Sequence, residues 1–227
     1  MTDVISDPIE EIYHHLLKWE PQGQIGMYEA RLLASFIEQQ QPESIVEVGV
    51  ASGFSSAFMA HCMKRYTNNG LVAAIDYGEK VYYDESKEVC FIALEEAKTM
   101  PEVAIESHAS RTSFDIEQIA NGRKFDAALI DGDHYHPWCT LDSLMLLPYL
   151  KPGGFVFCHD VHLYLIKNYR EQFGPKVVYD QMPDNMRFLD ENTPWPSSYI
   201  YLVPDDYTSL AKNFALALMY PWPEGYK

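Results

Sequence analysis

The chain has 227 residues, of which 47% are hydrophobic and 14% aromatic, and this composition suits one packed α/β core and excludes a disordered protein. Its 33 acidic and 17 basic residues give a formal net charge of −16. Because such a surface repels nucleic-acid phosphate and anionic lipid, we expect no nucleic acid and no membrane among its partners, and a small molecule or another protein is the more natural ligand.

The first half of the chain alternates between helical and extended patterns. Apolar residues at helical spacing predict helices over Ile9–Trp19 and Met27–Glu38, and Pro42 ends the second. The next predicted elements, in chain order, are strand Ile45–Val48, helix Ser55–Tyr66, strand Leu71–Ile75, helix Ser86–Lys98 and strand Val103–Ser107. Continuous apolar strands separated by helices indicate a parallel sheet that is covered on both faces.

The second half continues this alternation and then changes. Its predicted elements are helix Thr112–Ala120, strand Phe125–Ile130, helix Leu141–Leu150, strand Phe155–Cys158, two further strands Val177–Tyr179 and Tyr199–Val203, and helix Ser209–Met219. Because no linker or internal repeat interrupts them, we expect a single domain over residues 1–227. Its expected parts are an N-terminal helical extension (1–26), a core (27–204), and a C-terminal helix and tail (205–227).

The cysteines and the N-terminal sequence indicate the cellular compartment. The four cysteines show neither C-x-x-C spacing nor a secreted framework, which predicts reduced thiols in a cytoplasmic protein: Cys62, Cys90, Cys139 and Cys158. The first residues lack the basic start and apolar core of a signal peptide. No apolar run approaches the roughly 20 residues of a membrane span. We therefore expect a soluble, cytoplasmic protein.

The segment I-V-E-V-G-V-A-S-G-F runs from an apolar strand through a turn of small residues into a helix. In this turn, Gly49, Ala51, Ser52 and Gly53 would let a ligand lie against free backbone N–H groups. A tight turn without any ligand is the alternative interpretation of this pattern by itself. The turn also lacks the G-x-G-x-x-G spacing of dinucleotide-binding proteins.

Two acidic residues narrow the type of ligand. Glu47 precedes Gly49 by two residues, and its negative charge beside the turn suits an amino group or a sulfonium better than a pyrophosphate. Asp76 ends the next strand, where a carboxylate can accept hydrogen bonds from ribose hydroxyls. Together these features favour a positively charged nucleoside as the ligand.

Two more carboxylates close strands at the predicted carboxyl edge of the sheet. Asp131 and Asp160 should lie next to the turn, where hard oxygen ligands could bind a divalent cation that lowers the pKa of a substrate hydroxyl. His134 follows Asp131 by three residues, and its ordinary pKa of about 6.5 suits a general base. A partly exposed loop histidine is the alternative interpretation of His134.

Four stretches together resemble the class I S-adenosylmethionine-dependent methyltransferases: E-V-G-V-A-S-G-F, A-A-I-D, F-D-A-A-L-I-D-G-D-H and L-K-P-G-G-F-V-F-C-H-D. Within that superfamily they are most similar to the metal-dependent small-molecule O-methyltransferases of the macrocin and rhamnosyl type, with catechol O-methyltransferase more distant. The resemblance spans about Met27 to Val161. It implies a Rossmann-like three-layer α/β sandwich with a seven-stranded, mostly parallel sheet and an antiparallel last strand.

The resemblance also implies roles for particular residues. It places Glu47, Gly49 and Gly53 on the methionine side of S-adenosylmethionine, Asp76 at the ribose, Ser110 near the adenine, and Ala51, Ser52 and Asp131 beside the cofactor. It makes His134 the general base. Ala51 stands where the family more commonly has glycine, a mild steric change.

The implied metal ligands are Asp131, His159 and Asp160. The family usually has a carboxylate where this chain has His159, and imidazole favours Mn, Fe, Co or Zn over Mg. Either the divalent metal is such a softer ion, or His159 has another role and the metal site is weak or lost.

The implied activity is metal-assisted methyl transfer from S-adenosylmethionine to a hydroxyl of a small-molecule acceptor. Three alternatives stay open: a cofactor-binding protein that has lost catalysis, an NAD(P) oxidoreductase, and a non-haem iron enzyme, whose usual ligands are two histidines and a carboxylate. The acceptor pocket is expected in residues 1–26 and 181–198, which carry no diagnostic motif, so sugars, phenols and polyketides all remain open. Because family members often pair through the N-terminal segment, a homo-oligomer is among the expected states.

Overall fold

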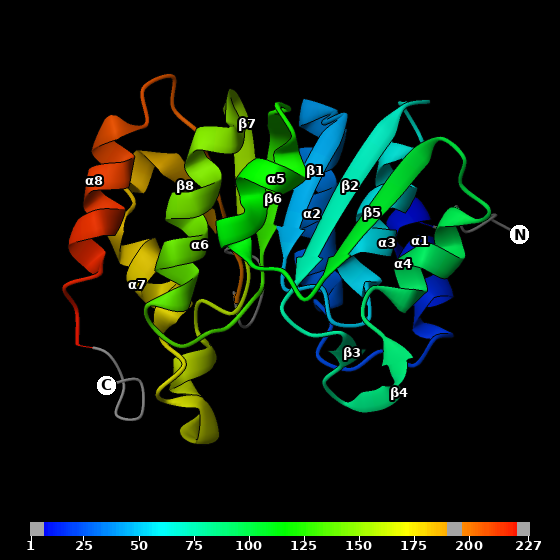
Figure 1. Cartoon of the computed structure of the whole chain (residues 1–227), viewed down its shortest axis with the longest axis horizontal. Coiled ribbons are helices and arrows are strands. Elements are labelled where there is room, and N and C mark those ends of the chain that lie inside the picture. The colour runs from blue at the N-terminus through cyan, green and yellow to red at the C-terminus, as the bar shows by residue number, and fades with distance from the viewer. Residues whose placement is uncertain (1–6, 190–196, 222–227) are drawn as a thin grey trace, which may run out of the picture.

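A seven-stranded sheet forms the centre of the computed structural model, which describes residues 7–189 and 197–221 (Figure 1). The strand order is β5-β2-β1-β6-β7-β9-β8. From β5 to β7 the neighbours pair in parallel, whereas β9 is antiparallel to both β7 and β8. The sheet confirms the predicted Rossmann-like α/β fold with an antiparallel last strand. Its strands are β1 (Ser44–Val48), β2 (Gly70–Asp76), β5 (Val103–Ala109), β6 (Phe125–Ile130), β7 (Leu150–Cys158), β8 (Arg187–Leu189) and β9 (Tyr199–Leu202).

Helices cover both faces of the sheet (Figure 1). One buried core lies between the sheet and α1–α4, and a second lies between the sheet and α5–α8. The helices are α1 (Pro8–Leu17), α2 (Met27–Gln40), α3 (Phe54–Met63), α4 (Phe91–Ala97), α5 (Ile116–Ala120), α6 (Trp138–Leu146), α7 (Gly174–Gln181) and α8 (Thr208–Ala217). The described residues also form five 3₁₀ turns: Ser113–Asp115, Leu147–Tyr149, Leu163–Leu165, Lys167–Tyr169 and Asp184–Met186.

The two cores explain why the central strands carry continuous apolar runs. In β6, Ala127 and Leu129 belong to the first core, whereas Ala128 and Ile130 belong to the second. A strand that is buried on both faces has no polar alternation. No helix among residues 7–189 and 197–221 is both long and apolar enough to cross a lipid bilayer.

The position of the site follows from the strand order. The chain runs from β1 outward to β2 and β5, and then returns to β6 on the other side of β1. The loops that follow β1 and β6 therefore diverge, which leaves a crevice at the carboxyl edge of these two neighbours. The turn after β1 and the loop after β6 are the two segments that the sequence singled out.

The strand predicted over Val177–Tyr179 is wrong, because these residues lie in α7. Pro175 occupies the first turn of this helix, where its missing N–H costs no hydrogen bond. The buried side chains of Val177 and Val178 thus come from one helix, and their β propensity is overridden by packing. In the main sheet, β8 was not predicted; it pairs with β9.

The predicted helix Ser86–Lys98 is also too long at its start. A small antiparallel hairpin, β3 (Lys80–Val81) and β4 (Asp84–Glu88), precedes α4. In the same way the predicted helix Leu141–Leu150 ends early, because α6 gives way to a 3₁₀ turn and Leu150 already belongs to β7.

Candidate active site

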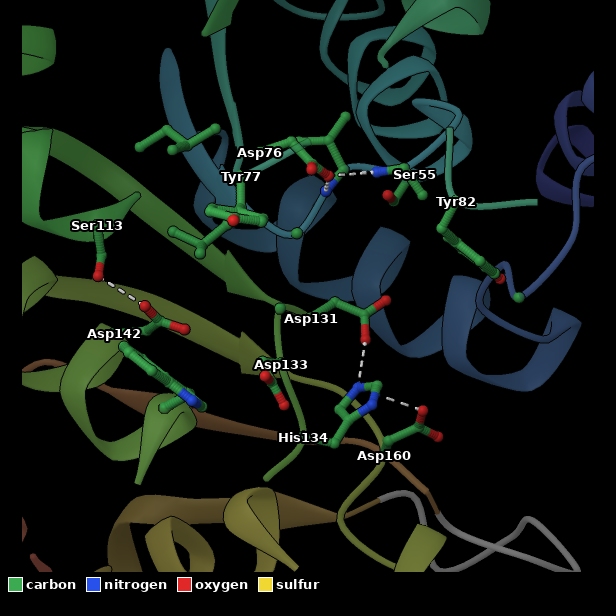
Figure 2. Close-up of a pocket in the computed structure, with 18 of the residues that line it drawn as sticks. Ser55, Asp76, Tyr77, Tyr82, Ser113, Asp131, Asp133, His134, Asp142 and Asp160 are labelled. Carbon is green, nitrogen blue, oxygen red and sulfur yellow. Dashed lines mark hydrogen bonds and ion pairs between the residues drawn. The ribbon is translucent and has the colours of Figure 1, made fainter. Parts of the chain in front are cut away.

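Loops at the carboxyl edge of the sheet enclose a cavity of about 950 Å³. This volume lies at the upper end of the usual range for small-molecule sites, roughly 300–1,000 Å³. Residues 22–25, which precede α2, line the cavity together with Tyr82 of the β3–β4 hairpin. Asp142 and Ser113 lie at the end opposite to Tyr82 (Figure 2).

The turn after β1 forms one wall of this cavity. Gly49 has a φ of +85°, and a Cβ atom built on it would lie 2.1 Å from the carbonyl oxygen of Asp131. Only glycine allows this close approach, which brings the turn directly against the end of β6. Gly53 has the same φ but packs against the backbone of Cys90, and the three residues between the glycines, Val50, Ala51 and Ser52, line the cavity.

The carboxylate of Asp76 holds this turn in place (Figure 2). Its Oδ2 accepts hydrogen bonds from the backbone N–H groups of Val50 (2.9 Å) and Ala51 (2.8 Å), and its Oδ1 accepts one from Gly78 (2.7 Å). A carboxylate has about four lone-pair positions, so Asp76 keeps capacity for a further donor. Asp76 also lines the cavity, so its position is compatible with the predicted contact to ribose.

Glu47 lies behind the turn rather than in the cavity wall. Its side chain is fully buried, and its two oxygens are hydrogen-bonded to the hydroxyls of Ser55 and Ser56. Burial raises the pKa of Glu47 to about 8, which the two serine hydroxyls offset only in part. Glu47 is therefore protonated at neutral pH and positions Ser55, which does line the cavity. The sequence predicted a negative charge beside the turn, whereas the buried carboxyl is neutral.

The end of the cavity opposite Tyr82 is lined by residues that were not predicted from the sequence. Ser110 is exposed and its hydroxyl donates to Glu79 at 3.0 Å, whereas the residues after it, up to Phe114, line the cavity. The Ser113 hydroxyl donates to Asp142 at 2.6 Å, and burial raises the pKa of Asp142 to about 6. The sequence signal that could have predicted this end of the cavity is Asp142, an acidic residue in the largely apolar helix α6.

The predicted metal ligands and the predicted general base lie together after the ends of β6 and β7: Asp131, His134, His159 and Asp160. The Oδ1 atom of Asp131 lies 3.2 Å from Nε2 of His134 and 2.9 Å from Nδ1 of His159. Oδ2 of Asp160 lies 3.5 Å from each of the same two nitrogens. We call these four residues the edge cluster. One ligand atom from each lies within 4.8 Å of all the others.

A fifth residue, Glu29 of α2, joins the edge cluster from outside. Its Oε1 lies 3.1 Å from Nε2 of His159 and accepts a hydrogen bond from the Ser198 hydroxyl at 2.8 Å. Its Oε2 accepts one from the backbone N–H of Gly26 at 2.6 Å. The sequence spacing of Gly26 and Glu29 is that of a capping box, so it indicated only a helix start and gave no sign of the contact with His159.

The carboxylates and the imidazoles of the edge cluster shift one another's pKa values. Burial alone would lower the pKa values of His134 and His159, but both pKa values are raised. For His134, the charges of Asp131 and Asp160 outweigh burial. For His159, those of Asp131 and Glu29 do so. Conversely, the two histidines overcome burial and lower the pKa of Asp131 to about 2. Burial and the charge of Asp131 raise the pKa of Asp160. Two carboxylates and two imidazoles are donors that suit Mn, Fe, Co or Zn, so the residues present fit a divalent metal.

Comparison with known proteins identifies the family. The model of a family described as a methyltransferase domain matches residues 46–161, which is about half of the chain and includes both the turn after β1 and the edge cluster. No curated protein sequence matches the chain.

Solved structures share the fold at low sequence identity. An O-methyltransferase from Bacillus cereus in complex with SAH is 17% identical with a TM-score of 0.62, and the match covers 89% of this chain and 93% of that one. The O-methyltransferase of tomaymycin synthesis from Streptomyces achromogenes, in complex with SAM, is 15% identical with a TM-score of 0.61 and coverages of 88% and 90%. An SAH-bound methyltransferase from Podospora anserina is 13% identical with a TM-score of 0.60 and coverages of 87% and 88%.

Proposed function

The chain belongs to the methyltransferase-domain family, and we propose that it transfers a methyl group from S-adenosylmethionine to a hydroxyl oxygen of a small molecule. One observation carries the proposal. Gly49 of the turn lies against the backbone of Asp131, so a cofactor held by the turn has its reactive end beside the edge cluster. Similar structures bound to SAM or SAH support the choice of cofactor.

In this proposal the cavity holds the cofactor along its length. The backbone of Gly49, Ala51 and Ser52 and the hydroxyl of Ser55 bind the methionine part, and Asp76 accepts hydrogen bonds from the ribose. The adenine lies toward the end lined by the residues after Ser110, where Trp138 and Asp142 are also found. Gly53 and Glu47 act indirectly, because they shape the turn from behind.

A divalent metal would be held by Asp131, His159 and Asp160, with His134 also within reach. When bound, it supplies positive charge that lowers the pKa of the acceptor hydroxyl. His134 lines the cavity, where the charges of Asp131 and Asp160 raise its pKa. In its neutral form, Nε2 of His134 can accept the hydroxyl proton.

The reaction we propose is an in-line displacement. The acceptor oxygen forms a bond to the methyl carbon as the bond from carbon to sulfur breaks, and the sulfur keeps the electron pair and loses its positive charge. The proton of the hydroxyl goes to His134. The protein contributes mainly by holding the two reactants in line, which replaces a bimolecular encounter by a positioned one.

The acceptor site lies at the Tyr82 end of the cavity. Of the segments expected to form it, residues 22–25 do line the cavity, and the Tyr82 hydroxyl donates to the carbonyl of Gln22 at 3.3 Å. Tyr169 and Gln172 line the same cavity from the segment after β7. The described parts of the other expected segment, 181–189 and 197–198, contribute no lining residue, and residues 190–196 lie outside the described residues.

The test is calorimetry of the purified chain with S-adenosylmethionine, SAH and NADH. We expect binding of the first two in a 1:1 ratio and no binding of NADH, because the turn fits a nucleoside and lacks the dinucleotide spacing. Absence of S-adenosylmethionine binding would overturn the proposal. An NAD(P) oxidoreductase and a non-haem iron enzyme are not favoured, since the family that matches the site region is a methyltransferase domain.

A further inference from the structure

A second cluster of metal-binding side chains lies outside the cavity, where α1 contacts α3 and α4. His15 of α1, His61 of α3 and Glu96 of α4 each offer one ligand atom, and the three atoms lie within 4.8 Å of one another. We propose that this cluster binds a divalent transition-metal ion such as Zn²⁺, which fastens the N-terminal helix to the rest of the molecule. This inference does not depend on the proposed methyl transfer.

The geometry of the three side chains converges on one point. The Nε2 atoms of His15 and His61 each lie 2.9 Å from the same oxygen, Oε2 of Glu96. Two imidazoles and a carboxylate form a usual three-residue zinc set with an open fourth position. Ligand atoms bound tetrahedrally at about 2.0 Å lie roughly 3.3 Å apart, so each imidazole nitrogen needs to move only a few tenths of an ångström away from Oε2 of Glu96.

The burial of these side chains suits a site with one open side. The side chains of Glu96 and His61 are only 5% and 10% exposed, whereas that of His15 is 46% exposed. Glu96 is oriented by a hydrogen bond from the indole N–H of Trp19, at 2.8 Å to Oε1. Such outer partners fix the direction in which a ligating carboxylate points. An ion can therefore enter past His15 and meet a carboxylate that is already in place.

Lys18 shows that this position already attracts positive charge. Its Nζ lies 2.9 Å from Oε1 of Glu96 and 2.9 Å from Nε2 of His15. The same nitrogen of His15 cannot accept a hydrogen bond from Lys18 and donate one to Glu96 at once, so one of its two contacts is always unsatisfied. A metal ion resolves this conflict, because it binds the lone pair of His15 and the carboxylate together. Lys18, which is 47% exposed, can turn into solvent.

The protonation states favour metal binding as well. Burial lowers the pKa of His61, which keeps its imidazole neutral at physiological pH. Burial would raise the pKa of Glu96, but hydrogen bonds from Trp19, His61, Lys18 and His15 outweigh it and lower this pKa to about 2. A metal needs neutral imidazole and ionised carboxylate, and both are present.

The experiment separates this cluster from the edge cluster. Zn²⁺ alone is titrated by calorimetry into a variant that carries Asp131→Asn and Asp160→Asn, and then into the same variant with His15→Ala added. The matched control adds His14→Ala instead, which removes an exposed histidine of the same helix that lies outside the cluster. We expect one Zn²⁺ per chain, at least about 100-fold weaker binding after His15→Ala, and unchanged binding after His14→Ala.

Two further measurements make the result independent of heat signals. Zn²⁺ at 100 times its Kd should raise the melting temperature by about 5–10 °C in the background variant and in His14→Ala, but not in His15→Ala. Co²⁺ should give the visible bands of a tetrahedral site, which Glu96→Gln abolishes. Absence of Zn²⁺ binding in the background variant, or equal binding with and without His15, would overturn the proposal.

Discussion

Oε1 of Glu29 lies 3.1 Å from Nε2 of His159, while Nδ1 of the same ring lies 2.9 Å from Asp131. The imidazole is thus held between two carboxylates, one from α2 and one from the end of β6. Glu29 is fixed in turn by Gly26 and Ser198. A histidine that faces a metal with one nitrogen and donates from the other to a carboxylate has its ring direction and tautomer set by that partner.

Glu29→Gln should therefore weaken metal binding without touching the cofactor site. We expect the affinity for Mn²⁺, measured by the electron paramagnetic resonance signal of the free ion, to fall about 10–100-fold, because the amide orients His159 less firmly. Binding of S-adenosylmethionine should stay unchanged. The control is Glu38→Gln on the same helix, where the side chain is 67% exposed. Equal Mn²⁺ affinities of Glu29→Gln and the native chain would contradict this orienting role.

The sheet could be predicted because its central strands carry continuous apolar runs, a pattern that survives any detail of packing. The hairpin before α4 could not, since β4 has the sequence D-E-S-K-E and takes its extended form from pairing with β3. The strand prediction at Val177 and Val178 failed for the opposite reason. Their β propensity is real, but Pro175 in the first turn and the packing of Val178 in the second core favour a helix.

The edge cluster could be predicted because parallel strands end at one edge, so residues that follow β6 and β7 must meet. Glu29 and Asp142 come from helices, where the side that a residue faces is decided by tertiary packing. The protonation state of Glu47 could not be predicted from the sequence either. Only its complete burial removes the negative charge that the sequence assigns to it.

Gly49→Ala should disrupt the turn and with it cofactor binding. A Cβ atom would lie 2.1 Å from the Asp131 carbonyl oxygen at a φ of +85°, so strain and overlap both act. We expect a loss of about 3 kcal/mol or more in the free energy of unfolding, measured with urea, and no binding of S-adenosylmethionine. Gly153→Ala is the matched control, because its φ is +78° with no atom within 4 Å. It should cost only about 1–2 kcal/mol.

Glu47→Gln should change how stability depends on pH. The folded chain holds the Glu47 proton up to about pH 8, whereas the unfolded chain releases it near 4.5, so the native protein loses stability as pH rises through this window. The contribution amounts to at most about 5 kcal/mol, at roughly 1.4 kcal/mol per unit of pKa. Glutamine cannot ionise, so the variant should gain stability relative to the native chain between pH 5 and 8. Parallel urea-unfolding curves at these pH values would show the gain, and an unchanged difference would contradict the buried proton.

Asp160→Asn and Asp76→Asn should separate the two halves of the site. Asp160 has a φ of +58°, a conformation that asparagine tolerates well, so its substitution removes the charge and keeps the backbone. We expect it to abolish Mn²⁺ binding and to spare S-adenosylmethionine binding. Asp76→Asn should do the reverse, because its carboxylate holds the N–H groups of Val50 and Ala51 in the turn. Both affinities can be measured by calorimetry on the same samples. If each substitution lowered both affinities alike, the metal and the cofactor would not occupy the separate walls that we assign to them.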